Sequence, residues 1–341
     1  MAKNILLLPA TMVDIDERVD RVLRGLGNPE PPLRLDDVRE LLKLDLAYYT
    51  AADPGIAREA VSRIRVATIQ VFKRPTLIID AIRKFSLKAL YLPDRKRIML
   101  DSDEPKLKHR WSQAHEVGHS LLPWHEEMMH GDNEHTLSKS CIEHIEAEAN
   151  FAGGRLLFLR NRFVEEARSS APEIGTVKQL HKTYGNTLAS TLWRFVESVG
   201  DTQPVVGLMS CHPHVTRQPS NHDPAKPCKH FIQSLAFQAR FGRLSEADLF
   251  SAVRRYCGAQ RGGILGQAEM ILTDDNGNCH RFSFETFYNG YDALTLGVYI
   301  AEEPIRVAVG AIQSVDWTAR ILRNTTQGER SVCRAVNGCC E

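Results

Sequence analysis

The sequence RWSQAHEVGHSLL, residues 110–122, carries the strongest signal in this chain of 341 residues. Within it, His115 and His119 are four residues apart, a spacing that places two side chains on one face of a helix, about 6 Å apart. Two imidazoles at that distance can bind one Zn²⁺, and Glu116 then projects beside a water on the metal. Zinc lowers the pKa of such a water towards about 7, so that a neighbouring carboxylate can take its proton. The stretch therefore predicts a helix with two metal ligands, His115 and His119, and a general base, Glu116.

A catalytic zinc site needs a third protein ligand. Residues 140–160 predict a second helix, on which Glu146 is the best placed candidate. Glu146 lies four residues before Asn150, so both point along one helix face, where Asn150 can hydrogen-bond a ligating histidine. Glu148 lies about 160° around the helix from Glu146 and is the alternative third ligand. Further candidates are Glu143, His125, His130, His135 and His144.

Hydrolysis at such a site also needs a hydrogen-bond donor, besides the metal, for the negative charge that develops on the substrate oxygen. Four histidines follow the motif, and each is a candidate for this role: His125, His130, His135 and His144. Their spacing selects none of them, so the oxyanion donor stays open among the four.

Three segments together resemble the ImmA/IrrE family of zinc metallopeptidases: HEVGHSLL at 115–122, EAEAN at 146–150, and Leu156-Leu157. RWS at 110–112 stands where members carry Arg-aromatic-Ser/Thr. The resemblance covers residues 88–199, about a third of the chain. It implies a minimal gluzincin-like core with His115, His119 and Glu146 as zinc ligands and Glu116 as the base. It also implies a protein substrate, a helix-turn-helix transcriptional repressor, whose cleavage relieves repression of stress-response or mobile-element genes.

The chain departs from the family pattern in three places. Ala152-Gly153-Gly154 replaces the usual Phe-Ala pair, Leu159 stands where proline is common, and His125 replaces a histidine two residues earlier. These differences leave the expected ligands intact and affect the shape of the substrate pocket.

The fold expected from the whole pattern is α+β: a mostly helical minimal zinc-metallopeptidase core with a small β-hairpin, then a separate α+β domain with an antiparallel sheet. The hairpin is predicted from 90–92 and 98–100, and the later sheet from strands at 268–273, 279–288 and 293–301. The expected organisation is a helical region at 1–75 (with helices at 35–47 and 56–72), the peptidase domain at 76–202, a linker at 203–230, a regulatory or substrate-selecting domain at 231–324 and a flexible tail at 325–341.

Residues 177–199 suggest two helices around Tyr184-Gly185-Asn186, an arrangement like a helix-turn-helix. Basic residues are few there: Lys178, Lys182 and Arg194. A packed helical hairpin that completes the peptidase domain is therefore favoured over DNA binding.

Cys211, His214, Cys228 and His230 include enough soft ligands for a second, structural zinc. Their pairs do not match the usual CxxC or Hx₃₋₅H spacings, and Pro213 and Pro227 intervene. We therefore expect a polar linker here rather than a second metal site.

The composition excludes several classes of protein. Hydrophobic residues make up 43% and charged residues 25%, values typical of globular proteins rather than of disordered or fibrous chains. Lys+Arg 43 against Asp+Glu 42 leaves a net charge of +1, so no global field attracts nucleic acid or an acidic membrane. The longest apolar run, Ile5–Leu8, is too short for a membrane helix. Eight cysteines without a CxxC pair fit a reducing compartment, so a cytoplasmic protein is expected.

These observations favour a zinc-dependent endopeptidase that cleaves a specific protein, such as a transcriptional repressor. One alternative is a non-catalytic regulator that binds a repressor or DNA through the same fold. Another is a defence- or toxin-associated protease with a cellular target.

Overall fold

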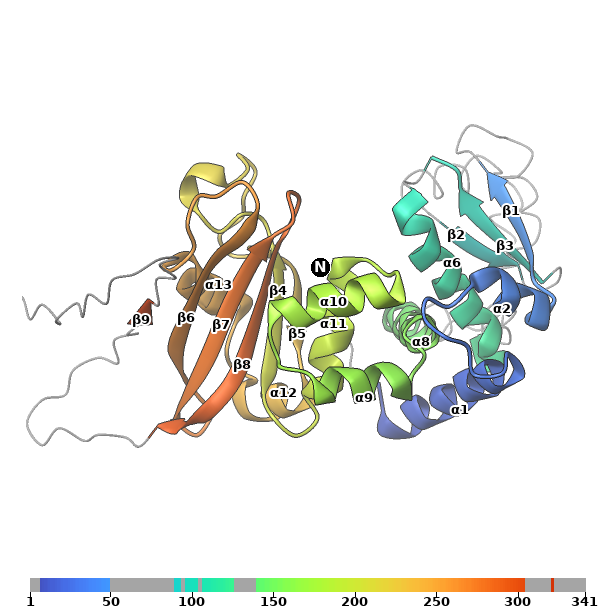
Figure 1. Ribbon diagram of the computed structural model, residues 1–341, viewed down its shortest axis with the longest axis horizontal. Coiled ribbons are helices and arrows are strands. Elements are labelled where there is room, and N and C mark those ends of the chain that lie inside the picture. The colour runs from blue at the N-terminus through green and yellow to red at the C-terminus, as the bar shows by residue number, and fades with distance from the viewer. Residues whose placement is uncertain are drawn as a thin grey trace, which may run out of the picture.

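The computed structural model describes residues 7–49, 89–92, 96–103, 106–125, 139–303 and 320–321. A six-stranded sheet forms one end of the molecule and a small three-stranded sheet the other, with helices packed between them (Figure 1). The α+β fold predicted from the sequence is confirmed. The expected helix at 56–72 and the expected tail at 325–341 lie outside the described residues.

The small sheet has the order β1-β3-β2. β2 (Ala89–Leu92) and β3 (Arg97–Asp101) form the predicted antiparallel hairpin, and β1 (Asp45–Tyr49) runs parallel to β3. The helix predicted over 35–47 is wrong beyond α2 (Leu35–Leu42). Lys43 adopts a left-handed conformation (φ 55°) that ends the helix, and the next residues pair with β3 instead. Long-range strand pairing overrides the local helical pattern here.

Besides α2, the described part of the chain has eight helices, and those predicted at 110–122, 140–160 and 177–199 are confirmed. Their bounds are α1 (Pro9–Gly25), α6 (Lys106–Leu121), α8 (Lys139–Leu157), α9 (Asn161–Ser169), α10 (Ile174–Tyr184), α11 (Leu188–Val199), α12 (Leu235–Phe241) and α13 (Glu246–Arg254). A short 3₁₀ turn, η2 (Val215–Arg217), lies between two of the strands. Among the described residues, no helix is both long and apolar enough to cross a membrane.

The large sheet is antiparallel throughout, with the order β5-β4-β8-β7-β6-β9. Its strands are β4 (Val205–Ser210), β5 (Cys228–Gln233), β6 (Gly263–Thr273), β7 (Cys279–Tyr288), β8 (Ala293–Glu303) and β9 (Arg320–Ile321). The linker predicted over 203–230 is therefore wrong at 205–210 and at 228–230. β4 pairs with both β5 and β8 and is buried along its whole length, and β5 begins at Cys228. The sequence does not indicate β4, because its few apolar residues lie in a segment that is otherwise rich in proline, histidine and serine.

The two faces of the large sheet belong to different parts of the core. Val205 and Leu294 face the helices α9–α11 and join one hydrophobic cluster with Phe195 of α11. On the opposite face, Phe282 packs with Phe237 of α12. The sheet therefore continues the hydrophobic core that surrounds α6 and α8, although the sequence suggests a separate second domain.

Candidate metal centre

The helices α6 and α8 cross at backbone contact, and two glycines make that crossing possible. A Cβ atom added to Gly118 would lie 2.5 Å from the carbonyl oxygen of Ala149, and one added to Gly153 would lie 2.7 Å from that of Ala114. Both distances are below any contact that a real side chain makes, so these positions require glycine.

This crossing brings three side chains to one point. His115 Nε2 and His119 Nε2 are 3.2 Å apart, and Glu146 places one carboxylate oxygen 3.1 Å from the first and the other 3.7 Å from the second. In a tetrahedral zinc site with bonds of about 2.0–2.2 Å, neighbouring ligand atoms are about 3.3 Å apart. The separations of 3.2 and 3.1 Å are close to that value, and the one between His119 and the other carboxylate oxygen of Glu146 is longer. His115, His119 and Glu146 can therefore hold a metal ion.

Glu116 lies beside this group and is 5% exposed. Burial raises the pKa of its carboxyl to about 7, the negative charge of Glu146 acts in the same direction, and the charge of His115 and the backbone N–H of Tyr91 oppose them. A carboxyl with a pKa near neutrality is suited to accept and return a proton. Tyr91 belongs to β2, so the small sheet helps to position this residue.

His115 is oriented by the same helix that supplies Glu146. Its Nδ1 lies 3.0 Å from the Oδ1 atom of Asn150, as the spacing of Glu146 and Asn150 predicts. An amide oxygen only accepts hydrogen bonds, so Nδ1 of His115 carries a proton in this contact. Burial alone would lower the pKa of His115, but the hydrogen bond from its ring to Glu146 and the charge of Glu116 raise it.

His119 is buried, and its ring has a different set of neighbours. Its Nδ1 lies 2.9 Å from Nδ1 of His125, whose Nε2 lies 2.8 Å from Oε2 of Glu148. Burial lowers the pKa of His119 to about 3, and the positive charge of His115 adds to this effect. His119 is thus neutral at pH 7, the state in which imidazole binds metals.

The other predicted site residues have different places. Glu148 is not a third ligand, because it accepts hydrogen bonds from His125 and from Nε1 of Trp124, 2.6 Å away. His125 lies behind His119 with both ring nitrogens occupied, so it is not free to act as an oxyanion donor. His144 is exposed and lies two residues before Glu146, about 160° around α8. His130 and His135 lie outside the described residues.

A half-buried arginine, Arg110, holds α6 in place. Arg110 donates to the carbonyl oxygens of Leu33 and Tyr184, at 2.8 and 3.4 Å, and to Oδ1 of Asn186, at 3.0 Å. These partners lie before α2 and between α10 and α11. The motif helix is therefore attached to two distant segments of the chain. The sequence alone gives no sign of these partners.

The residues of two weaker sequence signals lie elsewhere. Among the described residues, the group with metal-binding geometry is His115, His119 and Glu146, and it includes none of Cys211, His214, Cys228 and His230. Of the basic residues at 177–199, Arg194 is buried and paired with Glu197 at 2.7 Å. Its helix, α11, packs against the large sheet rather than facing solvent.

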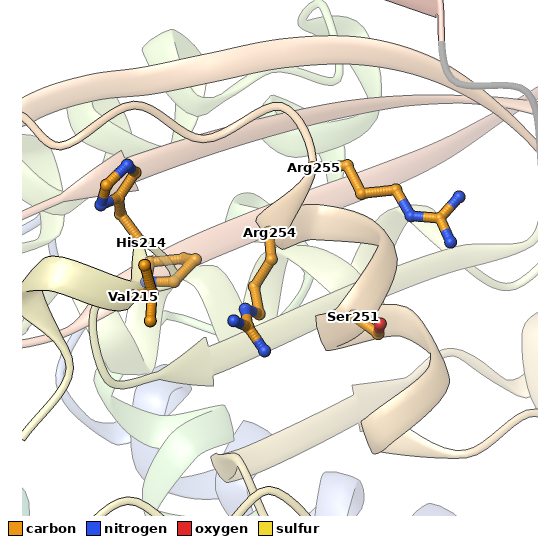
Figure 2. A pocket seen from close by; sticks show the side chains of 6 residues that line it. His214, Val215, Ser251, Arg254 and Arg255 are labelled. Atoms are coloured by element: carbon orange, nitrogen blue, oxygen red, sulfur yellow. The ribbon is translucent and has the colours of Figure 1, made fainter.

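A surface hollow lies on a different part of the molecule. It is lined by six residues from η2, the preceding loop and the C-terminal end of α13: Pro213, His214, Val215, Ser251, Arg254 and Arg255. Figure 2 shows the Arg254 side chain between His214 and Ser251, whereas Arg255 extends away from them. None of these elements contributes to the metal-binding group.

Comparison with known proteins identifies no family. No protein-family model matches the chain, and no curated protein matches it. Eleven chains of known structure match, among them one described as a Mycobacterium tuberculosis transcriptional regulator. That match has 12% sequence identity and a TM-score of 0.47, and it covers 85% of this chain and 76% of the other. A likeness this distant says nothing about activity.

Proposed function

We propose that this protein is a zinc-dependent endopeptidase of the ImmA/IrrE type. The observation that carries the proposal is the convergence of His115, His119 and Glu146 with ligand atoms within 4.8 Å of one another, next to the buried carboxyl of Glu116. Two neutral nitrogens and one carboxylate are the donor set of the catalytic zinc in several peptidases, which leaves a fourth position for water or substrate. A different metal that prefers the same nitrogen and carboxylate ligands would be revealed by the metal analysis in the test below.

The chain's own residues have distinct tasks in this reaction. Zinc, when bound, supplies a Lewis acid for the scissile carbonyl and lowers the pKa of water. Glu116 takes a proton from the attacking water at a carboxylate oxygen and returns it to the leaving amine nitrogen. Asn150 and His125 hold the two imidazoles in orientation, and Gly118 and Gly153 set the distance between the helices. The substrate of this proposal is a protein, namely a helix-turn-helix transcriptional repressor.

The first test separates binding from turnover. Wild-type protein loaded with one zinc per chain is incubated with a proteome-derived peptide library, and mass spectrometry identifies the new termini. Replacement Glu116→Gln keeps the three ligands but removes the base, so zinc content stays at one per chain while cleavage falls at least about 100-fold. Replacement Glu165→Gln, of an exposed residue on α9, is the matched control and keeps full activity.

Two results would overturn the proposal. One is a folded wild-type protein that takes up no zinc from an excess of the metal. The other is a zinc-loaded protein that cleaves nothing in the library or in a helix-turn-helix repressor encoded beside it. The second result would favour a non-catalytic regulator built on the same fold.

A further inference from the structure

Behind the metal-binding group, four polar side chains form one continuous chain of hydrogen bonds. Glu148 Oε2 lies 2.6 Å from Nε1 of Trp124 and 2.8 Å from Nε2 of His125, and His125 Nδ1 lies 2.9 Å from Nδ1 of His119. His125 and His119 are fully or almost fully buried. Water is therefore excluded from the two imidazoles, and each ring nitrogen in the chain must be satisfied by its neighbour.

The direction of these hydrogen bonds follows from the Glu148 carboxylate and from a single proton on the His125 ring. An ionised carboxylate only accepts, so His125 must donate from Nε2. In a neutral imidazole the other nitrogen is then an acceptor, so His125 accepts at Nδ1. His119 must in turn donate from its own Nδ1, which leaves the lone pair of its Nε2 directed at Glu146 and the metal position. Each step allows one arrangement of protons.

We propose that His125 and Glu148 are positioning residues that fix the proton of His119 on Nδ1, so that Nε2 is always ready to bind the metal. This inference rests on the proposed metal site and adds two residues to it. A carboxylate behind a ligating histidine is a known way to raise the basicity of the ligand and to fix its ring. Here the carboxylate acts through a second imidazole.

The carboxylate itself is held from the other side. Its Oε2 accepts from the Trp124 indole, which donates only, so the hydrogen bond to His125 keeps its direction. The Arg18 guanidinium of α1 lies 5.0 Å above the centre of the Trp124 ring, a cation–π contact.

The two ligating histidines thus differ in how they are held. His115 meets the neutral amide of Asn150, which can present either an oxygen or an NH₂ group after a flip. His119 is bonded to His125, which is bonded to the Glu148 carboxylate. A carboxylate only accepts hydrogen bonds, so it cannot change its role by flipping as an amide can. The structure therefore assigns the stricter control to His119.

The direct test is the tautomer of each ring in the wild-type protein. Selective ¹⁵N labelling of histidine and long-range ¹H–¹⁵N spectra at pH 7.5 distinguish a ring protonated on Nδ1 from one protonated on Nε2. Without metal, we expect His119 to be the Nδ1–H form and His125 the Nε2–H form. His119 as the Nε2–H form would overturn the inference. This measurement needs no variant.

The second test uses zinc affinity, measured by competition with a chelator, with no reference to peptide cleavage. Glu148→Ala removes the acceptor, so we expect about 10–100-fold weaker zinc binding and a mixture of His119 tautomers. Glu148→Gln restores part of the affinity, because its carbonyl oxygen can still accept from His125. Trp124→Phe leaves the direction of the chain unchanged, so the tautomer of His119 stays the same. Glu165→Ala is the exposed control and changes neither quantity.

These outcomes separate the inference from the proposed function. If wild type binds zinc and Glu148→Ala binds it equally tightly, the positioning role is wrong and the metal site stands. If wild type binds no zinc, the proposed function fails. The measured tautomers of His119 and His125 then test the positioning role by themselves. If zinc binds and weakens as expected but no peptide is cleaved, the positioning role stands without the peptidase.

Discussion

At the scale of single residues, the buried pair of Asp274 and His280 makes stability depend on pH. Asp274 Oδ2 lies 3.0 Å from Nε2 of His280, and its Oδ1 accepts from the backbone N–H groups of Asn276 and Asn278. Burial alone would raise the pKa of Asp274, but these hydrogen bonds lower it from 3.8 to about 2. Because the folded-state value is the lower one, the pair stabilises the fold above about pH 4. This stabilisation is lost as the pH falls from about 4 to about 2.

We therefore expect Asp274→Asn to lower the free energy of unfolding by about 2 kcal/mol at pH 7, with a much smaller loss at pH 2.5. Urea denaturation at pH 7, 4 and 2.5 measures this difference. Asp14→Asn, of an exposed residue on α1, is the control and shows no such pH dependence. An equal loss at all three pH values would contradict the explanation.

Residue spacing predicts contacts well within one helix and poorly between segments. The pairs His115–His119 and Glu146–Asn150 each lie on one helix face, and the structure brings their side chains together as the spacing indicates. The contact between His125 and Glu148 depends on how α6 and α8 cross, and the spacing of residues within one helix does not predict that crossing. The only hint of this contact in the sequence is a histidine a few residues after the HExxH motif.

At the scale of elements, the crossing of α6 and α8 can be tested with glycine substitutions. Gly118→Ala and Gly153→Ala each place a methyl group against a backbone carbonyl, so the helices must move apart. We expect each to destabilise the fold by about 1–3 kcal/mol and to weaken zinc binding. Thermal melting and chelator competition measure the two effects.

Gly154→Ala is the matched control on the same helix. Its added methyl group would meet only the Trp111 ring at 3.7 Å, an ordinary contact. Alanine also favours a helix over glycine by about 0.5–1 kcal/mol, so stability stays the same or rises. Equal loss in all three variants would show that the crossing does not depend on close backbone contact.

Secondary structure can be predicted where the sequence has a clear hydrophobic periodicity or clear turn residues, but not where a strand forms only by pairing with a distant segment. The strands predicted at 279–288 and 293–301 are confirmed as β7 and β8. β7 alternates between buried and less buried residues, whereas β8 is buried throughout 293–298, so the turn residues before β8 are its clearer signal. The sequence does not predict β1, β4 and β5, because each is short and depends on a distant partner. Their residues contain no local signal strong enough to distinguish a strand from a helix or a loop.

At the scale of the whole molecule, the large sheet and the metal-binding helices share one hydrophobic cluster. The backbone N–H of Ile174 in α10 also donates to Oε2 of Glu285 in β7, at 2.9 Å. We therefore expect a single thermal transition whose calorimetric and van't Hoff enthalpies agree. Two separate transitions would show that the sheet unfolds independently.

The same shared core predicts a long-range effect. Leu294 of β8 is 1% exposed in this cluster, so Leu294→Ala should cost about 2–5 kcal/mol and lower the temperature at which bound zinc is released. Tyr291→Ala, at an 85% exposed turn position, should leave that temperature unchanged. Zinc release is followed with a colorimetric chelator during heating. Release at the wild-type temperature in both variants would contradict a shared core.

The close approach of Gly118 and Gly153 also has a consequence for the choice of ion. The backbones of α6 and α8 are already in contact at these glycines. The distance between the ligand side chains on the two helices is therefore fixed by the main chain rather than by flexible side chains. A larger cation such as Ca²⁺, with bonds of about 2.3–2.6 Å, would have to increase that distance. The two glycines would then favour small cations over large ones, in addition to the preference of the histidine and carboxylate ligands for certain metals.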